Sequence, residues 1–199
     1  MRPSAIVPQR LVPGDGLYPG ILLARLGEAA PASLDAVGPL TYLANPKTAL
    51  FCSARSPGTV ILPAYDTARR LRDTGRTVIS GFHSPIEKEC LEILLRGTQP
   101  VIICPARAAG TIRVPAGCRG AFDAGRILFL FPFAEEPRRV TRDSAIRRNT
   151  VVAALADEAF VPHVSEGGET ARILDALKGW NVPILSHLTG APDQRKEIG

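Results

Sequence analysis

The sequence lacks the short motifs that mark several common classes of enzyme. Its 199 residues contain no GxGxxG fingerprint, no Walker loop, no GxSxG elbow and no HExxH pair. These absences disfavour a dehydrogenase, a P-loop ATPase and an α/β-hydrolase. No apolar run approaches the roughly 20 residues that span a bilayer. The N-terminal segment MRPSAIVPQR lacks the apolar core of a signal peptide. We therefore expect a cytoplasmic protein that does not insert into a membrane.

Cysteine and aromatic residues are also few. The four cysteines form no CxxC pair and have no histidine at ligand spacing, which argues against a disulfide framework or a zinc site. Cys52 and Cys104 end apolar runs, where a thiol usually acts as a small hydrophobe. Aromatic residues make up 6% of the chain, and Phe82 and Phe133 are the rings that we expect at the surface. The formal net charge of +5 is compatible with an anionic partner.

From Thr48 onward, short apolar runs alternate with helical patterns, which is typical of βαβ units and a parallel sheet. The runs VIIC and ILFLF are continuously apolar, as strands buried on both faces should be. The fold class is therefore α/β, with a doubly wound, mostly parallel sheet and helices on both faces (Rossmann-like). The predicted strands are Ala49–Cys52, Thr77–Ser80, Pro100–Cys104, Ile127–Phe131, Glu158–Val161 and Val182–Leu185. The predicted helices are Val60–Asp73, Pro85–Arg96, Ser144–Ala156 and Glu169–Gly179.

The composition divides the chain into three parts. Residues 1–47 are rich in proline and glycine and predict an irregular lead-in that packs on the domain, with short helices around Ile21–Leu26 and Ala32–Val37. Residues 48–186 form the predicted Rossmann-like domain. Residues 187–199 are a polar tail that we expect to fray.

In open parallel sheets, ligands bind outside the carboxyl ends of the strands, and two loops there are candidates. The first, CSARSPG, combines small residues with an arginine that suits a phosphate. The second precedes a helix with a capping box, Ser84 to Glu87, and with Pro85 at its first position. Its histidine has no catalytic partner in the sequence, so a binding or structural role is favoured. The candidate residues in these loops are Ser53, Arg55, Gly58, Gly81, His83 and Ser84.

Two further segments fall at the same edge of the predicted sheet. Residues 137–149 hold five arginines and one aspartate, and Asp143 or Ser144 can cap the next helix. Cations around a helix N-terminus suit a phosphodiester backbone, although a solvated basic face is the other reading. The segment SEGGET places two glycines before a helix, with Thr170 or Ser165 as possible caps. The candidates here are Arg138, Arg139, Arg142, Arg147, Arg148, Asn149, Gly167, Gly168 and Thr170.

Taken in order, these segments resemble the DNA-processing protein A family (DprA/Smf), within the group of SLOG-type Rossmann-like domains. The lead-in YPG through SARSPG, the segment VISGFHSPIEKECLEIL, the stretch FPFAEEPRRVTRDSAIRRNTVVAALADEAFV and SEGGETARILDAL parallel motifs of that family over roughly residues 18–185. The chain departs from the family at Ser53-Ala54-Arg55, at Pro85-Ile86-Glu87, at Leu91 and at His163. No winged-helix domain follows residue 186, so the resemblance is to a short, divergent member.

The resemblance implies a domain that binds single-stranded DNA and acts in DNA processing, uptake or recombination. In better-known members it helps to load the RecA recombinase, and the family's domain commonly self-associates, so a recombinase partner and a homo-oligomer are expectations. Carried over by position, Arg55, Gly81, Arg148 and Asn149 are the pocket candidates. We expect no catalytic residue, no metal and no cofactor.

A second hypothesis is a small-nucleotide site, because SLOG relatives include nucleotide-binding sensors and phosphoribohydrolases. Gly167-Gly168-Glu169-Thr170 is a shortened and rearranged echo of the loop that supplies the hydrolase carboxylate, which would make Glu169 the catalytic group. A third hypothesis is a partner-binding scaffold. The leading hypothesis is a non-enzymatic domain that binds single-stranded nucleic acid, mainly through electrostatic contacts.

Overall fold

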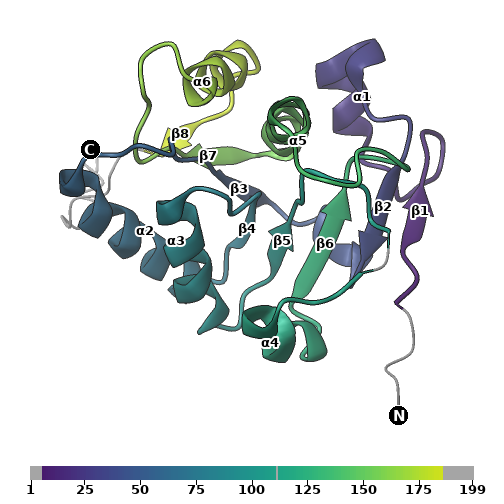
Figure 1. Ribbon diagram of the computed structural model, residues 1–199, viewed down its shortest axis with the longest axis horizontal. Coiled ribbons are helices and arrows are strands. Elements are labelled where there is room, and N and C mark those ends of the chain that lie inside the picture. The colour runs from purple at the N-terminus through teal and green to yellow at the C-terminus, as the bar shows by residue number, and fades with distance from the viewer. Residues whose placement is uncertain (1–5, 111, 186–199) are drawn as a thin grey trace, which may run out of the picture.

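The computed structural model describes residues 6–110 and 112–185, and within these ranges the chain forms one eight-stranded sheet with helices on both faces (Figure 1). The order of strands across the sheet is β1-β2-β6-β5-β4-β3-β7-β8. The strands are β1 (Gln9–Leu11), β2 (Leu34–Val37), β3 (Lys47–Leu50), β4 (Thr77–Ser80), β5 (Val101–Ile103), β6 (Ile127–Phe131), β7 (Glu158–Phe160) and β8 (Ile184–Leu185). The α-helices are α1 (Gly20–Leu26), α2 (Ile61–Asp73), α3 (Pro85–Leu95), α4 (Arg119–Asp123), α5 (Arg142–Leu155) and α6 (Glu169–Gly179).

The strands from β3 to β8 all pair in parallel, whereas β2 pairs antiparallel with β6, and β1 antiparallel with β2. The chain runs outward from β3 through β4 and β5 to β6. Helix α5 then carries it back across the sheet to β7, on the other side of β3. This reversal of direction at β3 is the doubly wound topology, and it confirms the predicted fold class.

Each face of the sheet has its own apolar core, and β6 shows why its sequence is continuously apolar. Ile127, Phe129 and Phe131 belong to the core that contains α2, α3 and α4. Leu128 and Leu130 belong to the core that contains α1, α5 and α6. Because successive side chains of a strand point to opposite faces, a strand covered on both sides has no polar position. Figure 1 shows the two layers of helices with the sheet between them.

The lead-in contributes strands as well as a helix. The predicted helix at 21–26 is confirmed as α1, but the predicted helix at 32–37 is wrong, because residues 34–37 form β2. Its side chains alternate between the cores: Leu34 and Ala36 face α1 and α5, whereas Val37 joins the other core. A four-residue run is too short to show which period applies, so pairing with β6 decides its conformation.

The predicted helix starts are confirmed at α3 and at α6, and the start of α5 is corrected. Ser84 and Glu87 form the expected capping box, with Pro85 as the first residue of α3. Helix α5 begins earlier than expected, since its N-cap is Thr141, whose hydroxyl accepts a hydrogen bond from the Ser144 amide at 3.1 Å. The N-cap of α6 is Gly168, so neither Ser165 nor Thr170 fills that position. The sequence patterns did not predict α4.

The four cysteines are free and buried, and the burial of Cys52 and Cys104 agrees with the expectation that these two act as small hydrophobes. Burial raises the pKa of the Cys90 thiol and of the Cys104 thiol to about 12, so both stay protonated at neutral pH. Among the described residues, no helix is long and apolar enough to cross a membrane. The predicted polar tail, residues 187–199, lies outside the part of the chain that the structure describes.

Replacement of Leu128 by alanine should lower the free energy of unfolding by about 2–5 kcal/mol, because the side chain is fully buried between α5 and the sheet. The same change at Leu62, which is 68% exposed on α2, serves as a matched control and should stay within about 0.5 kcal/mol of the parent. Urea unfolding measures both values. Equal losses at the two positions would contradict the two-core description.

Candidate nucleic-acid interface

The loops that follow β3 and β7 flank the point where the strand order reverses, and they are joined to each other. The Ser53 amide donates to the His163 carbonyl at 3.3 Å, and the Ser165 amide donates to Ser53 Oγ at 2.9 Å. The Ser165 hydroxyl donates to the Arg55 carbonyl at 3.3 Å. Ligands of doubly wound sheets usually lie between such loops. Because these contacts join the two loops here, the hollows described next lie mainly beside the neighbouring loops, after β4, β5 and β6.

The loops after β3 and β4 are held by one buried carboxylate. Glu87 Oε1 accepts a hydrogen bond from the Cys52 amide at 2.8 Å. Its Oε2 accepts from the amides of His83 and Ser84 at 2.8 and 3.0 Å. This carboxylate therefore completes the cap of α3 and also fixes the position of the loop after β3. The expectation that Glu87 is a capping residue is confirmed.

The loop after β4 turns sharply at Phe82, which has a positive φ of 47°. A bulky residue rarely adopts this conformation, and here the Phe82 amide donates to Ser80 Oγ at 3.1 Å. The turn directs the Phe82 ring into the core, where it is 5% exposed, and leaves His83 exposed. Phe133 is also buried, at 3%. The prediction that these two rings lie at the surface is therefore wrong.

The side chain of Arg148 is buried at the centre of the same edge. Its Nη1 donates to the Cys104 carbonyl at 2.8 Å, and its Nε donates to Asn149 Oδ1 at 2.8 Å. The guanidinium lies against Gly81, where any Cβ would collide with it. Burial lowers the pKa of Arg148 from its ordinary value, but an arginine stays charged in a protein. Among the described residues, no carboxylate forms an ion pair with it.

Three hollows adjoin one another along this edge and share walls, and we call them together the cationic groove. The inner hollow lies beside the N-terminal parts of α5 and α6. It is lined by Cys52, Ala54, His83, Ser84, Glu87, Arg142, Ala145, Ile146, Arg148, Asn149, Glu169 and Thr170. The central pocket shares His83 and Arg148 with it and adds Arg107 and Arg113. The outer hollow shares Arg107 with the central pocket and adds Arg138 beside Glu135.

Several of the predicted residues meet in the cationic groove, and others do not. The groove contains Gly81, His83, Ser84, Arg138, Arg142, Arg148, Asn149 and Thr170. Outside its lining lie Ser53, Arg55, Gly58, Arg139, Arg147, Gly167 and Gly168. Arg147 points elsewhere, since its guanidinium lies 5.2 Å from the centre of the Phe133 ring. Arg55 is exposed, and a Cβ at Gly58 would meet no atom within 4 Å.

Sequence reasoning missed two arginines, Arg107 and Arg113, which line the central pocket. Both lie in the long connection between β5 and α4. A signal was present, because this connection leaves the carboxyl end of a strand that had been predicted. The signal is weak because Arg107 and Arg113 stand apart in the sequence, whereas the arginines of residues 137–149 form a cluster.

The fold and the groove can now be compared with known proteins. No protein-family model and no curated protein matches the sequence. The solved structure of DNA processing protein A (DprA) from Streptococcus pneumoniae matches with a TM-score of 0.73 and 16% sequence identity. This match covers 88% of the present chain and 61% of the S. pneumoniae chain.

DprA from Helicobacter pylori, whose structure addresses its single-stranded DNA binding mode, matches with a TM-score of 0.63 and 20% identity. That match covers 77% of the present chain and 71% of the H. pylori chain. The class of the protein is therefore a Rossmann-like α/β domain. Within that class its fold is DprA-like, as the resemblance in the sequence predicted.

Gly81→Ala should lower the free energy of unfolding by about 1–3 kcal/mol, because the added methyl group displaces the Arg148 guanidinium. In an Arg148→Ala background the same change should cost less than about 0.5 kcal/mol, since the obstructing atoms are gone. Urea unfolding of the four proteins in this cycle measures the coupling. Gly58→Ala, which meets open space, is the control. An equal cost in both backgrounds would show that the Gly81 backbone, and not Arg148, is the constraint.

Proposed function

We propose that this protein binds single-stranded DNA along the cationic groove and acts in DNA processing. One observation carries the proposal: arginines of two separate loops and of α5 line three adjoining hollows that share walls. These are Arg107, Arg113, Arg138, Arg142 and Arg148. The hollows lie at the edge of the sheet where ligands of this fold class bind. A polyanion that follows the groove meets a cation in each hollow.

Arg148 supports an anionic ligand more specifically than the exposed arginines do. A buried charge is normally paired, because its desolvation is costly. The carboxylate of Glu87 is close enough to act on Arg148 electrostatically, but both of its oxygens already accept hydrogen bonds from backbone amides. A phosphate in the groove would supply the direct ion pair that no described carboxylate forms with Arg148.

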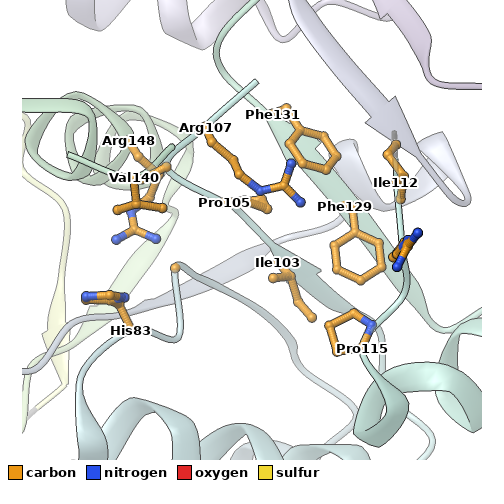
Figure 2. Close-up of a pocket in the computed structure, with 13 residues that line it drawn as sticks. His83, Ile103, Pro105, Arg107, Ile112, Pro115, Phe129, Phe131, Val140 and Arg148 are labelled. Carbon is orange, nitrogen blue, oxygen red and sulfur yellow. The ribbon is translucent and has the colours of Figure 1, made fainter. Parts of the chain in front are cut away.

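Acidic residues limit where the phosphates lie. Glu87 and Glu169 line the inner hollow, and Glu135 lines the outer one. Among the described residues that line the central pocket, the ionisable ones are all arginine or histidine (Figure 2). We therefore place the strongest phosphate contacts at the wall that the central pocket shares with the inner hollow, next to Arg148 and His83.

The choice of a single strand is supported by the DprA-like fold and by the single-stranded DNA binding described for the H. pylori protein. Phe82 and Phe133 are buried, so these two rings do not serve as surfaces for base stacking. Phosphate contacts then supply most of the affinity, and binding should depend strongly on salt. Recombinase loading, self-association and the nucleotide-binding alternative stay predictions.

Fluorescence anisotropy of a labelled oligo-dT, compared with a duplex across a salt series, tests the proposal. If all five groove arginines contact phosphates, the slope of log K against log salt should be about −3.5. The double variant Arg113→Ala/Arg142→Ala should bind more weakly and reduce the slope by about 1.4.

Arg96→Ala is the matched control, since this exposed arginine ends α3 at the opposite edge of the sheet. It should leave both the affinity and the slope unchanged. An absence of binding at low salt would refute the proposal. Equal losses in the Arg96 variant and in the double variant would refute the groove as its location.

A further inference from the structure

The exposed apolar side chains of this protein are concentrated in its lead-in. Among the described residues, seven large apolar side chains are exposed, and five of them lie between residues 7 and 23. Three of these belong to α1 or to the turn before it: Leu17, Ile21 and Leu23 are 52%, 40% and 43% exposed. In Figure 1, α1 lies at the end of the layer of helices that also contains α5 and α6. Single exposed apolar residues are common, but a cluster marks an interaction site.

The exposed side of helix α1 carries no polar side chain. At roughly 100° per residue, its four exposed residues span an arc of about 160°: Gly20, Ile21, Leu23 and Ala24. Leu22 lies opposite this arc and is fully buried. A surface helix normally turns polar residues outward, and a helix that is apolar on all sides is covered on all sides. We define the α1 face as the exposed residues Leu17, Gly20, Ile21, Leu23 and Ala24.

The charges around the α1 face are acidic. Between residues 12 and 32 the charged residues are Asp15, Arg25 and Glu28. Arg25 turns toward the end of α5, since its Nη1 donates to the carbonyls of Ala154 and Ala156 at 3.0 and 2.7 Å. Asp15 precedes α1 and Glu28 follows it, so an exposed carboxylate lies near each end of the helix. Neither carboxylate forms an ion pair with another described residue.

We propose that the α1 face binds an amphipathic helix of a partner protein. Its apolar stripe would pack on Leu17, Ile21 and Leu23, and its basic side chains would pair with Asp15 and Glu28. Amphipathic helices commonly bind in this way, through an apolar stripe on an apolar surface. The proposal does not rest on the proposed function, because no residue of the α1 face is among the described residues that line the cationic groove.

Charge selects this partner over the other occupants of an apolar surface. A second copy, paired about a twofold axis, would place carboxylate against carboxylate. In an antiparallel pair of helices Asp15 would meet Glu28, and in a parallel pair each acid would meet its own copy. A nucleic acid or an anionic membrane would meet the same two acids. Basic side chains are complementary to them, and charge pairs at both ends also fix the register of a bound helix.

A hollow of about 500 Å³ extends the α1 face beyond Glu28. It lies between α5 and the residues that follow α1, and most of its lining is apolar, including Leu26 and Val151. Arg147 is the one cation of its described lining, and the guanidinium lies 5.2 Å from the centre of the Phe133 ring. The hollow has room for a large apolar side chain of the partner, which a flat surface would not hold.

Fluorescence anisotropy of a labelled synthetic peptide tests the proposal. The peptide consists of about 15 leucines and lysines, ordered so that the leucines form one side of a helix, and a second peptide has the same composition in scrambled order. We expect the parent protein to bind the amphipathic peptide about 10-fold or more tightly than the scrambled one, because only the first presents a continuous apolar stripe. Equal affinity for the two peptides, or binding of neither, would overturn the proposal.

Substitutions on α1 locate the bound peptide. Ile21→Gln/Leu23→Gln should weaken binding of the amphipathic peptide about 10-fold or more, because two apolar contacts are lost. Leu62→Gln changes a side chain that is 68% exposed on α2, so it is the matched control and should bind as the parent does. Equal losses in the two variants would place the peptide elsewhere. Urea unfolding checks that the variants are folded, and the comparison of peptides in the parent decides the question if they are not.

The two acids are tested separately. Asp15→Asn/Glu28→Gln should weaken binding about 3-fold at low salt, and the loss should disappear at high salt, where exposed charges are screened. Glu89→Gln/Glu92→Gln removes two exposed acids of α3 and should leave the affinity unchanged. An equal loss in both double variants would show that the peptide responds only to the net charge of the protein, which would contradict the pairing at the ends of α1.

Sedimentation velocity and vesicle flotation, both without peptide, distinguish the other occupants. We expect the parent and Ile21→Gln/Leu23→Gln to have the same size in solution, and neither to float with phosphatidylcholine vesicles. A parent dimer that the substitutions convert to a monomer would overturn the proposal in favour of a second copy. Flotation of the parent but not of the variant would overturn it in favour of a membrane surface.

Discussion

The carboxylate of Glu87 accepts three backbone hydrogen bonds from two loops, and the arrangement of the groove depends on it. Through Cys52 it holds the loop after β3, and through His83 and Ser84 it holds the loop after β4. With the second loop in place, Gly81 presents a backbone with no side chain toward α5. Arg148 can therefore reach the Cys104 carbonyl at the end of β5. The buried carboxylate of Glu87 thus positions the buried guanidinium of Arg148 without forming an ion pair with it.

This arrangement separates the roles of the arginines. Arg148 is fixed by packing and by two hydrogen bonds, so it loses little conformational entropy when an anion arrives. Arg113 and Arg142 are exposed, so in the proposed function they would act mainly through their charge. A buried, hydrogen-bonded cation at the centre with exposed cations around it suits the proposed ligand, a strand that binds without regard to sequence.

The agreement between sequence and structure is best where a local rule acts alone. The capping box at Ser84 and Glu87 was read directly from spacing, since both partners lie within one turn of helix. The continuous apolar runs of β5 and β6 predict strands that are covered on both faces, and every residue of both strands is buried. The amide of Asn149, which lies inside helix α5, accepts a hydrogen bond from the Nε of Arg148 one residue before it.

The sequence by itself determined the class of fold, most helix boundaries and the edge of the sheet where a ligand should bind, because these depend on periodicity and on neighbouring residues. Only the tertiary structure decided which side chains face that edge. Residues 34–37 form a strand because they pair with β6. Phe82 became buried because a positive φ turned it inward. Arg107 joined the groove from a distant loop, and Arg147 left it for Phe133. Contacts between residues far apart in the chain made each of these choices, and no local pattern records them.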